Sequence, residues 1–263
     1  MRFALSLPNV GSPARLVELA VAAEQGGWDG VFLWEHLHLV RAQHLDVVDP
    51  WVTLGAMANA TDRVRLGTMV TPLPRRRPWK VAKEITTLDH LSNGRAIAGI
   101  GLGFPPDDEF EAFGESGDAR VRGAILDEGL SVLDGCLRGG AFRFSGVHHS
   151  VDVDLHPAPV QLPRPPIWIA GMWPNRRPVE RSRRFDGYFP VSVEGEPLDP
   201  STIEHIVATL EPPAPGFDVV ASWAEGFDAA AYEAAGATWL VDSRWPVGGW
   251  YDELLDVAQR GPG

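Results

Sequence analysis

Short apolar runs alternate with amphipathic helical segments along nearly the whole of this chain. Strands that are buried on both faces and separated by helices pair in parallel. Eight such strand–helix units in 263 residues have the size of a closed (β/α)8 barrel, the TIM barrel. We therefore predict one α/β barrel domain over residues 1–263. The expected strands are 3–7, 28–34, 64–69, 95–100, 167–170, 187–189, 217–221 and 238–241.

Capping residues followed by proline mark the starts of two helices, at Ser12-Pro13 and Asp49-Pro50. Proline suits the first helical position because its missing N–H would be unpaired there. Apolar residues then recur at helical spacing. The expected helices are 13–26, one from residue 49, then 78–91, 120–137, 178–185, 199–210, 227–235 and 250–259.

Two segments depart from the alternation. Residues 138–166 contain a sequence typical of a small hairpin, followed by many prolines. We expect an excursion inserted between the fourth helix and the fifth barrel strand. The proline-rich stretch 211–216 is expected to be a linker.

An open, doubly wound sheet is the alternative fold for an alternating α/β chain. Such a sheet is expected to carry a G-x-G-x-x-G phosphate-binding turn between its first strand and first helix. The turn here, 8–13, reads P-N-V-G-S-P. The barrel is therefore preferred, and in a barrel the functional groups lie at the C-terminal ends of the strands.

The C-terminal ends of the third and fourth expected strands are rich in glycine. Gly67 lies in the third, and Gly99, Gly101 and Gly103 follow one another in the fourth. Because glycine has no Cβ, backbone can approach a flat ligand closely at such positions. The pattern suggests a planar cofactor on one rim of the barrel, and tight packing of the barrel itself is the alternative explanation.

Glu35 and His36 follow the second expected strand. A carboxylate beside an imidazole is a plausible acid–base site, because histidine titrates near neutral pH and a neighbour can hold its tautomer. Adjacent residues of an extended strand point to opposite faces, so both can face the mouth only if the strand has already ended. A structural, hydrogen-bonding histidine is the alternative.

Gly171, Met172 and Trp173 follow the fifth strand and precede a helix. Backbone amides at such a turn can bind a phosphate, with Arg176 or Arg177 adding charge; a plain strand–helix hinge is the alternative. Trp34, Trp173 and Trp245 are candidates for aromatic walls around a substrate, and core or interface positions are the alternative.

The charged clusters of the sequence give little support for a metal site or for nucleic-acid binding. The acidic stretch 107–109 has no His or Cys at metal-ligand spacing, so we expect a solvated, partly mobile loop and no metal site. The arginine clusters 75–77 and 176–184 are read as solvated faces, with local anion binding as the alternative. A net charge of −12 without a long basic run disfavours nucleic-acid binding.

The single cysteine, Cys136, excludes an intramolecular disulfide and indicates a reducing compartment. No apolar run approaches the ~18 residues of a membrane-spanning helix, and the first residues are too short for a secretory signal. We expect a cytoplasmic protein that does not enter a membrane.

Four blocks together resemble the bacterial luciferase-like oxidoreductase family, which uses FMN or the deazaflavin coenzyme F420. They run in the family's order over about three quarters of the chain. Beyond about Pro190 the resemblance is faint. The blocks are A-E-Q-G-G-W-D-G-V-F-L-W-E-H (23–36), the stretch 49–78 containing D-R-V-R-L-G-T-M-V-T-P, L-D-H-L-S-N-G-R-A-I-A-G-I-G-L-G (88–103), and P-P-I-W-I-A-G-M-W (165–173) with F-D-G-Y-F-P (185–190).

The resemblance implies a luciferase-like barrel with the flavin ring across the ends of strands two to four. It implies a non-prolyl cis peptide at Met69-Val70, a catalytic role for His36 beside the ring, and a phosphate site at 171–173. Relatives are commonly dimers, so a homo-oligomer is expected. The implied cofactor-binding positions are Glu35, Gly67, Thr68, Met69, Val70, Gly101, Leu102, Gly103, Gly171, Met172 and Trp173.

Two positions depart from the family pattern. Phe104 stands where some sugar-phosphate dehydrogenases have an acidic residue, and Gly171-Met172 stands where relatives often have a glycine pair. A sugar-phosphate substrate and the phosphate pose are therefore in question.

The resemblance implies an oxidoreductase that moves a hydride, or inserts oxygen, on a small organic substrate bound over the ring of F420 or FMN. The blocks L-G-T-M-V and G-I-G-L-G are closer to the F420 branch. A non-catalytic barrel that binds flavin or a partner protein is the alternative.

Overall fold

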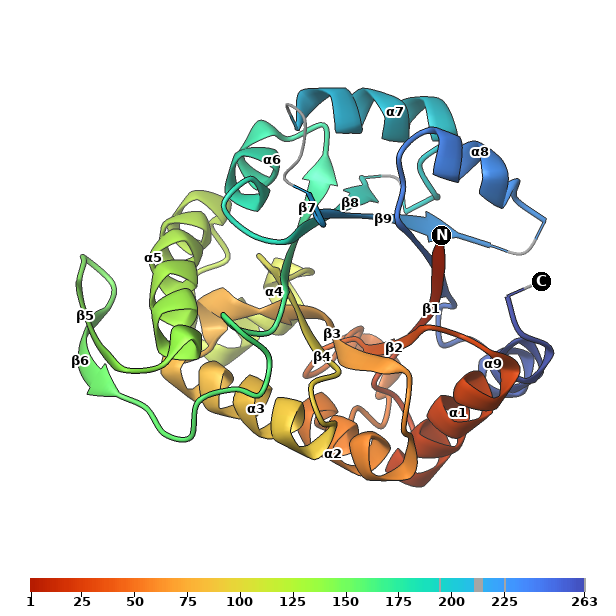
Figure 1. Cartoon of the computed structure of the whole chain (residues 1–263), viewed down its shortest axis with the longest axis horizontal. Coiled ribbons are helices and arrows are strands. Elements are labelled where there is room, and N and C mark those ends of the chain that lie inside the picture. The colour runs from red at the N-terminus through yellow and green to blue at the C-terminus, as the bar shows by residue number, and fades with distance from the viewer. Residues whose placement is uncertain (194, 211–214, 225, 263) are drawn as a thin grey trace.

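Eight parallel strands close into a barrel with helices around it (Figure 1), as the alternation predicts. The computed structural model describes residues 1–193, 195–210, 215–224 and 226–262, so residues 211–214 of the expected linker lie outside the described part. The strands follow the order β1-β10-β9-β8-β7-β4-β3-β2. Their bounds are β1 Arg2–Leu7, β2 Gly30–Leu33, β3 Arg65–Pro72, β4 Ala96–Gly101, β7 Ile167–Trp173, β8 Gly187–Ser192, β9 Asp218–Trp223 and β10 Trp239–Ser243.

The outer helices begin where the capping signals place them. Asp49 accepts a hydrogen bond from Val52 N at 2.9 Å, and Pro50 is the first residue of its helix. Gly27, with φ +88°, ends the first helix in the left-handed conformation that glycine favours. The bounds are α1 Pro13–Gly26, α2 Pro50–Ala60, α3 Pro78–Leu91, α5 Ala119–Arg138, α6 Arg176–Ser182, α7 Pro200–Thr209, α8 Ala229–Ala234 and α9 Trp250–Arg260.

The expected excursion is a hairpin of two short antiparallel strands, β5 Ala141–Ser145 and β6 Ser150–Asp154. It packs on α5 and projects from the barrel (Figure 1). Several barrel strands end differently from the expectation. β7 continues to Trp173 and β8 to Ser192, each three residues past the expected end. β2 already ends at Leu33, and β3 continues to Pro72 through a register shift between Thr68 and Thr71. The Met69-Val70 peptide bond inside that shift is cis, as predicted.

The barrel interior is filled by large side chains. The ring centroids of Phe32 and Trp168 lie 5.2 Å apart, and those of Trp168 and Trp239 lie 5.3 Å apart. Met69 and Ile97 belong to the same buried cluster. Since these side chains close the barrel lumen, a ligand of this fold must lie at the rim.

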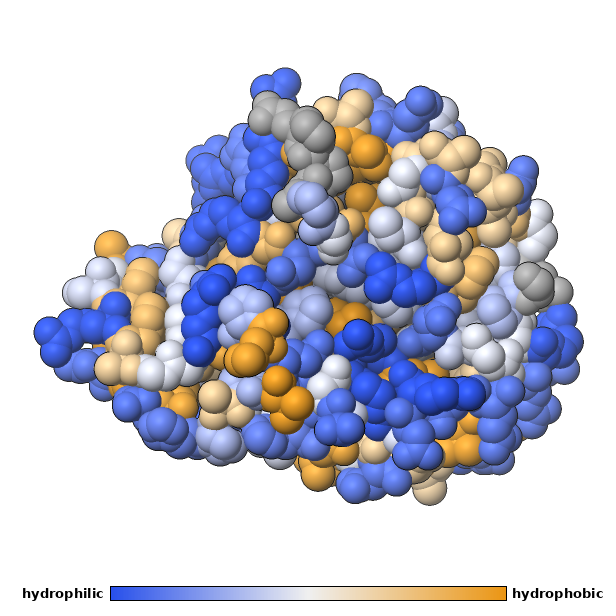
Figure 2. All heavy atoms as spheres, viewed as in Figure 1, coloured by the Kyte–Doolittle hydropathy of each residue, from blue (hydrophilic) through white to orange (hydrophobic). Residues whose placement is uncertain are grey.

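Hydrophilic residues cover most of the face viewed in Figure 2, where hydrophobic residues form only small groups. Among the described residues, no helix is both long enough and apolar enough to cross a membrane.

The glycines of β3 and β4 are explained by protein contacts. A Cβ on Gly67 would overlap the carbonyl oxygen of Ile97, and one on Gly99 would overlap that of Thr68. A Cβ on Gly101 would lie 2.6 Å from Val70 Cγ2. Packing, the alternative explanation, accounts for these glycines, so their missing side chains do not by themselves indicate a ligand slot.

We predict that Gly67→Ala destabilises the protein by about 3 kcal/mol or more, because backbone must move to admit the methyl group. Gly55→Ala is the matched control. A Cβ there lies 3.7 Å from Leu91 Cδ1, an ordinary contact within α2. We expect that control to raise the free energy of unfolding by about 0.5–1 kcal/mol. Urea unfolding measures both variants, and equal effects would contradict the packing explanation.

Candidate active site

The main chain of His36 is fixed by a buried asparagine. Because β2 ends at Leu33, Glu35 and His36 lie beyond the strand and need not alternate. Asn9 Nδ2 donates to the His36 carbonyl at 3.0 Å, and His36 N donates to Asn9 Oδ1 at 3.3 Å. Asn9 also donates to the Val48 carbonyl at 2.7 Å. Asn9 lies in the turn 8–13 after β1, and no local sequence signal marks it as a functional residue.

The imidazole of His36 stands at the rim, with its side chain 19% exposed. Its Nδ1 is buried and lies 3.4 Å from Glu109 Oε1, without the alignment of a hydrogen bond. The ring of Trp34 meets it edge-on at 5.9 Å between centroids. Among the described residues, Nδ1 is the buried nitrogen of this ring without a hydrogen-bond partner, and Nε2 has no hydrogen bond to a protein group either.

Glu109 is the buried anion beside this histidine. It ends the short helix α4 Pro106–Glu109, its side chain is 1% exposed, and it forms an ion pair with Arg75. The backbone N–H groups of Leu37, His38 and Leu39 donate to its carboxylate at 3.0, 2.9 and 2.7 Å.

The pKa of Glu109 lies well below its ordinary value of 4.5. Burial alone would raise the pKa, but interactions with His36, the His38 and Leu37 amides and Arg75 outweigh it. The carboxylate is therefore ionised at neutral pH. The expectation of a solvated acidic loop is wrong for Glu109, because its charge is balanced by donors from two other loops.

Glu35 is buried behind the rim and fully engaged with protein groups. It forms an ion pair with Arg76 and accepts hydrogen bonds from Trp51 Nε1 at 2.9 Å and Thr71 Oγ1 at 2.6 Å. Arg75 donates to the Glu35 carbonyl at 2.8 Å. The expectation that Arg75 and Arg76 form a solvated face is wrong, since both pair with buried carboxylates of neighbouring loops.

A buried arginine supports the end of β4. Arg122 donates to the carbonyls of Leu102 at 3.2 Å and Gly103 at 2.9 Å, and its guanidinium lies 4.5 Å from the ring centroid of Phe110. Leu102 and Gly103 are partly exposed, as is Val70 on β3. Sequence reasoning missed Arg122, because nothing local distinguishes it from other helix arginines.

The end of β7 lies next to β4 along the rim. The expectation that residues 171–173 form a turn is wrong, because they belong to β7 and pair with Pro190, Val191 and Ser192 of β8. Gly171, Met172 and Trp173 are partly exposed. A Cβ on Gly171 would overlap the Pro178 ring, which gives this glycine a packing role. Arg176 and Arg177 are exposed in the first turn of α6. The candidate positions on β2, β3, β4 and β7 therefore lie along one arc of the barrel mouth.

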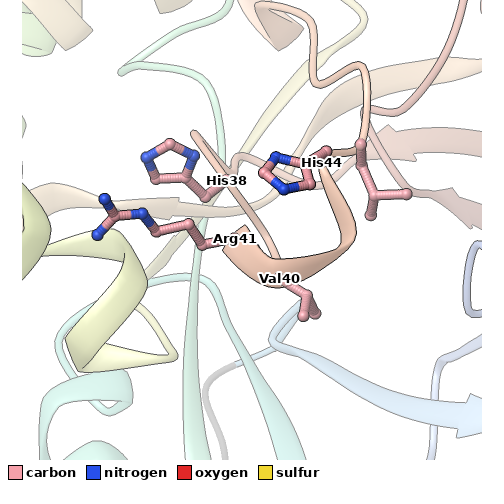
Figure 3. Close-up of a pocket in the computed structure, with 5 residues that line it drawn as sticks. His38, Val40, Arg41 and His44 are labelled. Carbon is pink, nitrogen blue, oxygen red and sulfur yellow. The ribbon is translucent and has the colours of Figure 1, made fainter.

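A pocket of about 340 Å³ lies in the loop after β2, close to His36 in the chain. Figure 3 shows His38, Arg41 and His44 on one side of this loop and Val40 on the other. Leu45 completes the lining, so no strand-end residue borders the pocket. The His38 ring is stacked on Phe113, with centroids 5.2 Å apart.

We predict that Glu109→Gln lowers the free energy of unfolding by about 3–5 kcal/mol, because it leaves buried Arg75 with only the more distant Glu35 carboxylate, at 3.9 Å, as a counter-charge. Asp107→Asn, at an exposed position of the same loop, is the control and should change stability by less than about 0.5 kcal/mol. Urea unfolding measures both. A loss from Glu109→Gln no larger than that of the control would contradict the role given to this ion pair.

The contribution of Glu109 to stability should depend on pH. Its pKa is lowered by folding, so its contribution is fully present above the ordinary value of 4.5 and is lost as pH falls below it. The stability difference between wild type and Glu109→Gln should therefore be constant from about pH 7 to 6 and shrink toward about pH 3. Urea unfolding over this range measures it, and a difference that grows on acidification would reverse the assignment.

The sequence and the fold were compared with known proteins. The profile of the family described as luciferase-like monooxygenase matches residues 1–239. An F420-dependent glucose-6-phosphate dehydrogenase of Beutenbergia cavernae is 31% identical over 202 residues, covering 73% of this chain and 56% of that protein. The oxygenase component of a flavin-dependent trigonelline monooxygenase of Acinetobacter baylyi is 30% identical, covering 61% of this chain and 43% of that protein.

The fold matches a solved coenzyme F420-dependent tetrahydromethanopterin reductase of Methanopyrus kandleri with a TM-score of 0.78 and 17% identity. The match covers 99% of this chain and 98% of the other. The chain spans about half the length of the curated relatives it matches. With the profile match over residues 1–239, the predicted resemblance is confirmed: this chain belongs to the luciferase-like monooxygenase family.

Proposed function

We propose that this protein is an oxidoreductase that uses F420 or FMN and acts on a small organic substrate bound over the cofactor ring. The observation that carries the proposal is the His36 imidazole. Its Nε2 is free of protein partners at the rim, and its Nδ1 faces the buried Glu109 carboxylate at 3.4 Å. The family of the chain supports the same chemistry.

The residues of the rim fit a flat, tricyclic ring. Val70, Leu102 and Met172 are uncharged and partly exposed on three neighbouring strand ends. Because side chains fill the barrel interior beneath these residues, a ligand there would lie on the rim and not inside the barrel. Gly67, Thr68 and Gly101 are buried and Met69 packs inside the barrel, so these four residues support the rim from within. We propose that Val70, Leu102, Gly103 and Met172 contact the ring, and that residues 171–173 with Arg176 and Arg177 hold the phosphate.

Glu35 is proposed to act through its neighbours. Its carboxylate is occupied by Arg76, Trp51 and Thr71, and Thr71 ends the β3 register shift. Glu35 would therefore fix the shape of the β3 end on which the cofactor lies. Direct contact with the cofactor would require it to give up one of these partners.

His36 is the group proposed to exchange a proton with the substrate. When bound, F420 supplies hydride transfer and FMN can also activate oxygen. Glu109 remains ionised because its pKa is well below the ordinary value, so it is no proton donor near neutral pH. Its role is to position the imidazole, so that Nε2 holds or releases a proton at a substrate oxygen.

We favour F420 over FMN. The F420-dependent relative covers 73% of this chain at 31% identity, and the flavin-dependent monooxygenase component covers 61% at 30%. A homo-oligomer and a cytoplasmic location remain expectations of the sequence.

A titration with each cofactor tests the proposal. We expect F420 fluorescence to be quenched with an affinity at least about tenfold higher than that for FMN, equal to about 1.4 kcal/mol. Tight FMN binding with no F420 binding would reverse the preference. Binding of neither would remove the basis for a flavin or deazaflavin enzyme, and binding without turnover over a broad substrate panel would favour the non-catalytic alternative.

His36→Gln should leave cofactor affinity unchanged and lower kcat by about 10²–10⁴-fold, the usual contribution of a positioned proton donor. His44→Gln is the matched control, since His44 is exposed in the loop pocket. Steady-state kinetics on a substrate that the wild type turns over measures both variants. Full activity of His36→Gln would show that the proton-transfer role is wrong.

A further inference from the structure

Two tryptophans form a continuous aromatic surface beside His36. The ring centroids of Trp34 and Trp245 lie 5.4 Å apart, and Trp34 in turn contacts His36 at 5.9 Å. Trp34 is anchored by its Nε1, which donates to Ser6 Oγ at 2.9 Å. Trp245 remains 49% exposed. A row of three rings therefore leads from the imidazole toward solvent.

The exposed ring of Trp245 is held in place by its own loop. Arg244 donates to both carboxylate oxygens of Asp242, at 3.0 and 3.1 Å, and Asp242 lies at the end of β10. Val247 N donates to the Trp245 carbonyl at 2.8 Å. Because the loop fixes the ring where it is half exposed, Trp245 offers a preformed aromatic surface.

Exposed aromatic side chains gather at this end of the barrel. In the described part of the chain, each large aromatic side chain that is strongly exposed belongs to a loop that follows a barrel strand. These side chains are Phe104, Phe113, Phe227 and Trp245, with exposures of 61, 50, 44 and 49%. Soluble proteins place such residues at surfaces that bind apolar partners or ligands.

Three arginines of the rim loops are already engaged with carboxylates. Arg75 and Arg76 pair with Glu109 and Glu35, and Arg244 pairs with Asp242. An anionic substrate beside the imidazole would have to compete with these carboxylates. Arg41, in the loop pocket of Figure 3, is the exposed cation closest to His36 along the chain.

The barrel order places the aromatic row opposite the proposed phosphate site. β2 and β10 both flank β1, and β7 lies three strands from each of them. Trp173, at the end of β7, packs against His205 instead, with centroids 5.7 Å apart. Of the three candidate tryptophans, only Trp34 and Trp245 therefore lie together.

We infer that the substrate of this site is a flat, uncharged, largely apolar molecule that lies against the Trp34–Trp245 pair with its reacting oxygen toward His36 Nε2. This inference rests on the proposed function and adds the class of substrate. It also separates this chain from an enzyme for sugar phosphates.

The test compares three probes on the protein with and without bound coenzyme: 2-naphthol, which is flat and uncharged, cyclohexanol, which is not flat, and glucose 6-phosphate, which is anionic. Saturation-transfer NMR and quenching of tryptophan fluorescence give the affinities. We expect 2-naphthol to bind most tightly, cyclohexanol more weakly and glucose 6-phosphate most weakly. Tighter binding of glucose 6-phosphate than of 2-naphthol overturns the inference.

Variants then assign the binding to the aromatic row. Trp245→Ala should weaken the binding of 2-naphthol by at least about fivefold, a loss in the range expected for one aromatic contact. Trp245→Phe should retain most of the affinity. Leu162→Ala removes a more exposed apolar side chain, 86% exposed before β7, and should have no effect. Unchanged 2-naphthol affinity in Trp245→Ala overturns the inference.

A second variant and a measurement of the oligomeric state complete the test. If Trp245→Ala does not fold, as judged by circular dichroism, Trp245→Leu removes the ring while keeping bulk and should show the same loss. Sedimentation of each variant detects an interface: a dimer of the wild type that dissociates in Trp245→Ala overturns the assignment to substrate.

Coenzyme affinity, measured in parallel, separates this inference from the proposed function. Coenzyme binding without 2-naphthol binding refutes the aromatic site alone. Binding of 2-naphthol that depends on Trp245 without any coenzyme binding refutes the redox function and leaves the aromatic site in place.

Discussion

The ion pair between Arg75 and Glu109 is the interaction on which the geometry of the mouth depends. It joins the loop after β3 to the loop after β4, and the same carboxylate is bound by three amides of the loop after β2. A buried carboxylate without these partners would be strongly unfavourable. Three loops that are distant in sequence are therefore fixed by one charge, and His36 stands beside it.

A second buried charge pair extends this arrangement inward. Glu35 binds Arg76 and also Thr71, which lies where β3 resumes its pairing with β4. Arg75 connects the two pairs, because it donates to the Glu35 carbonyl. The networks convert the end of β3, with its cis Met69-Val70 bond, into a defined surface. The two buried ion pairs thus hold the uncharged end of β3 in one conformation.

The fold followed from local patterns, whereas the charge network did not. Apolar periodicity and caps such as Asp49-Pro50 place each strand and helix within a few residues, because those signals depend on neighbours in the chain. Glu109 binds groups about seventy residues away, and composition alone describes D-D-E as a solvated loop. A usable signal was present. Arg75 and Arg76 follow β3, and acidic residues follow the neighbouring strands β2 and β4. The C-terminal ends of parallel strands meet at one edge of the barrel, so these charges could be expected to lie together.

The division of the rim into two halves has a consequence for how such a site diversifies. On one side, loops after β2, β3 and β4 share buried charges, so a substitution of Arg75 or Glu109 disturbs the surroundings of the imidazole. On the other side, the β10 loop is held mainly by contacts within itself, through Arg244–Asp242 and the Val247–Trp245 turn. We expect changes there that preserve the contact of residue 245 with Trp34 to leave the charged groups around His36 in place. Substitutions in the β10 loop can therefore change which substrate is bound while the groups around His36 stay the same.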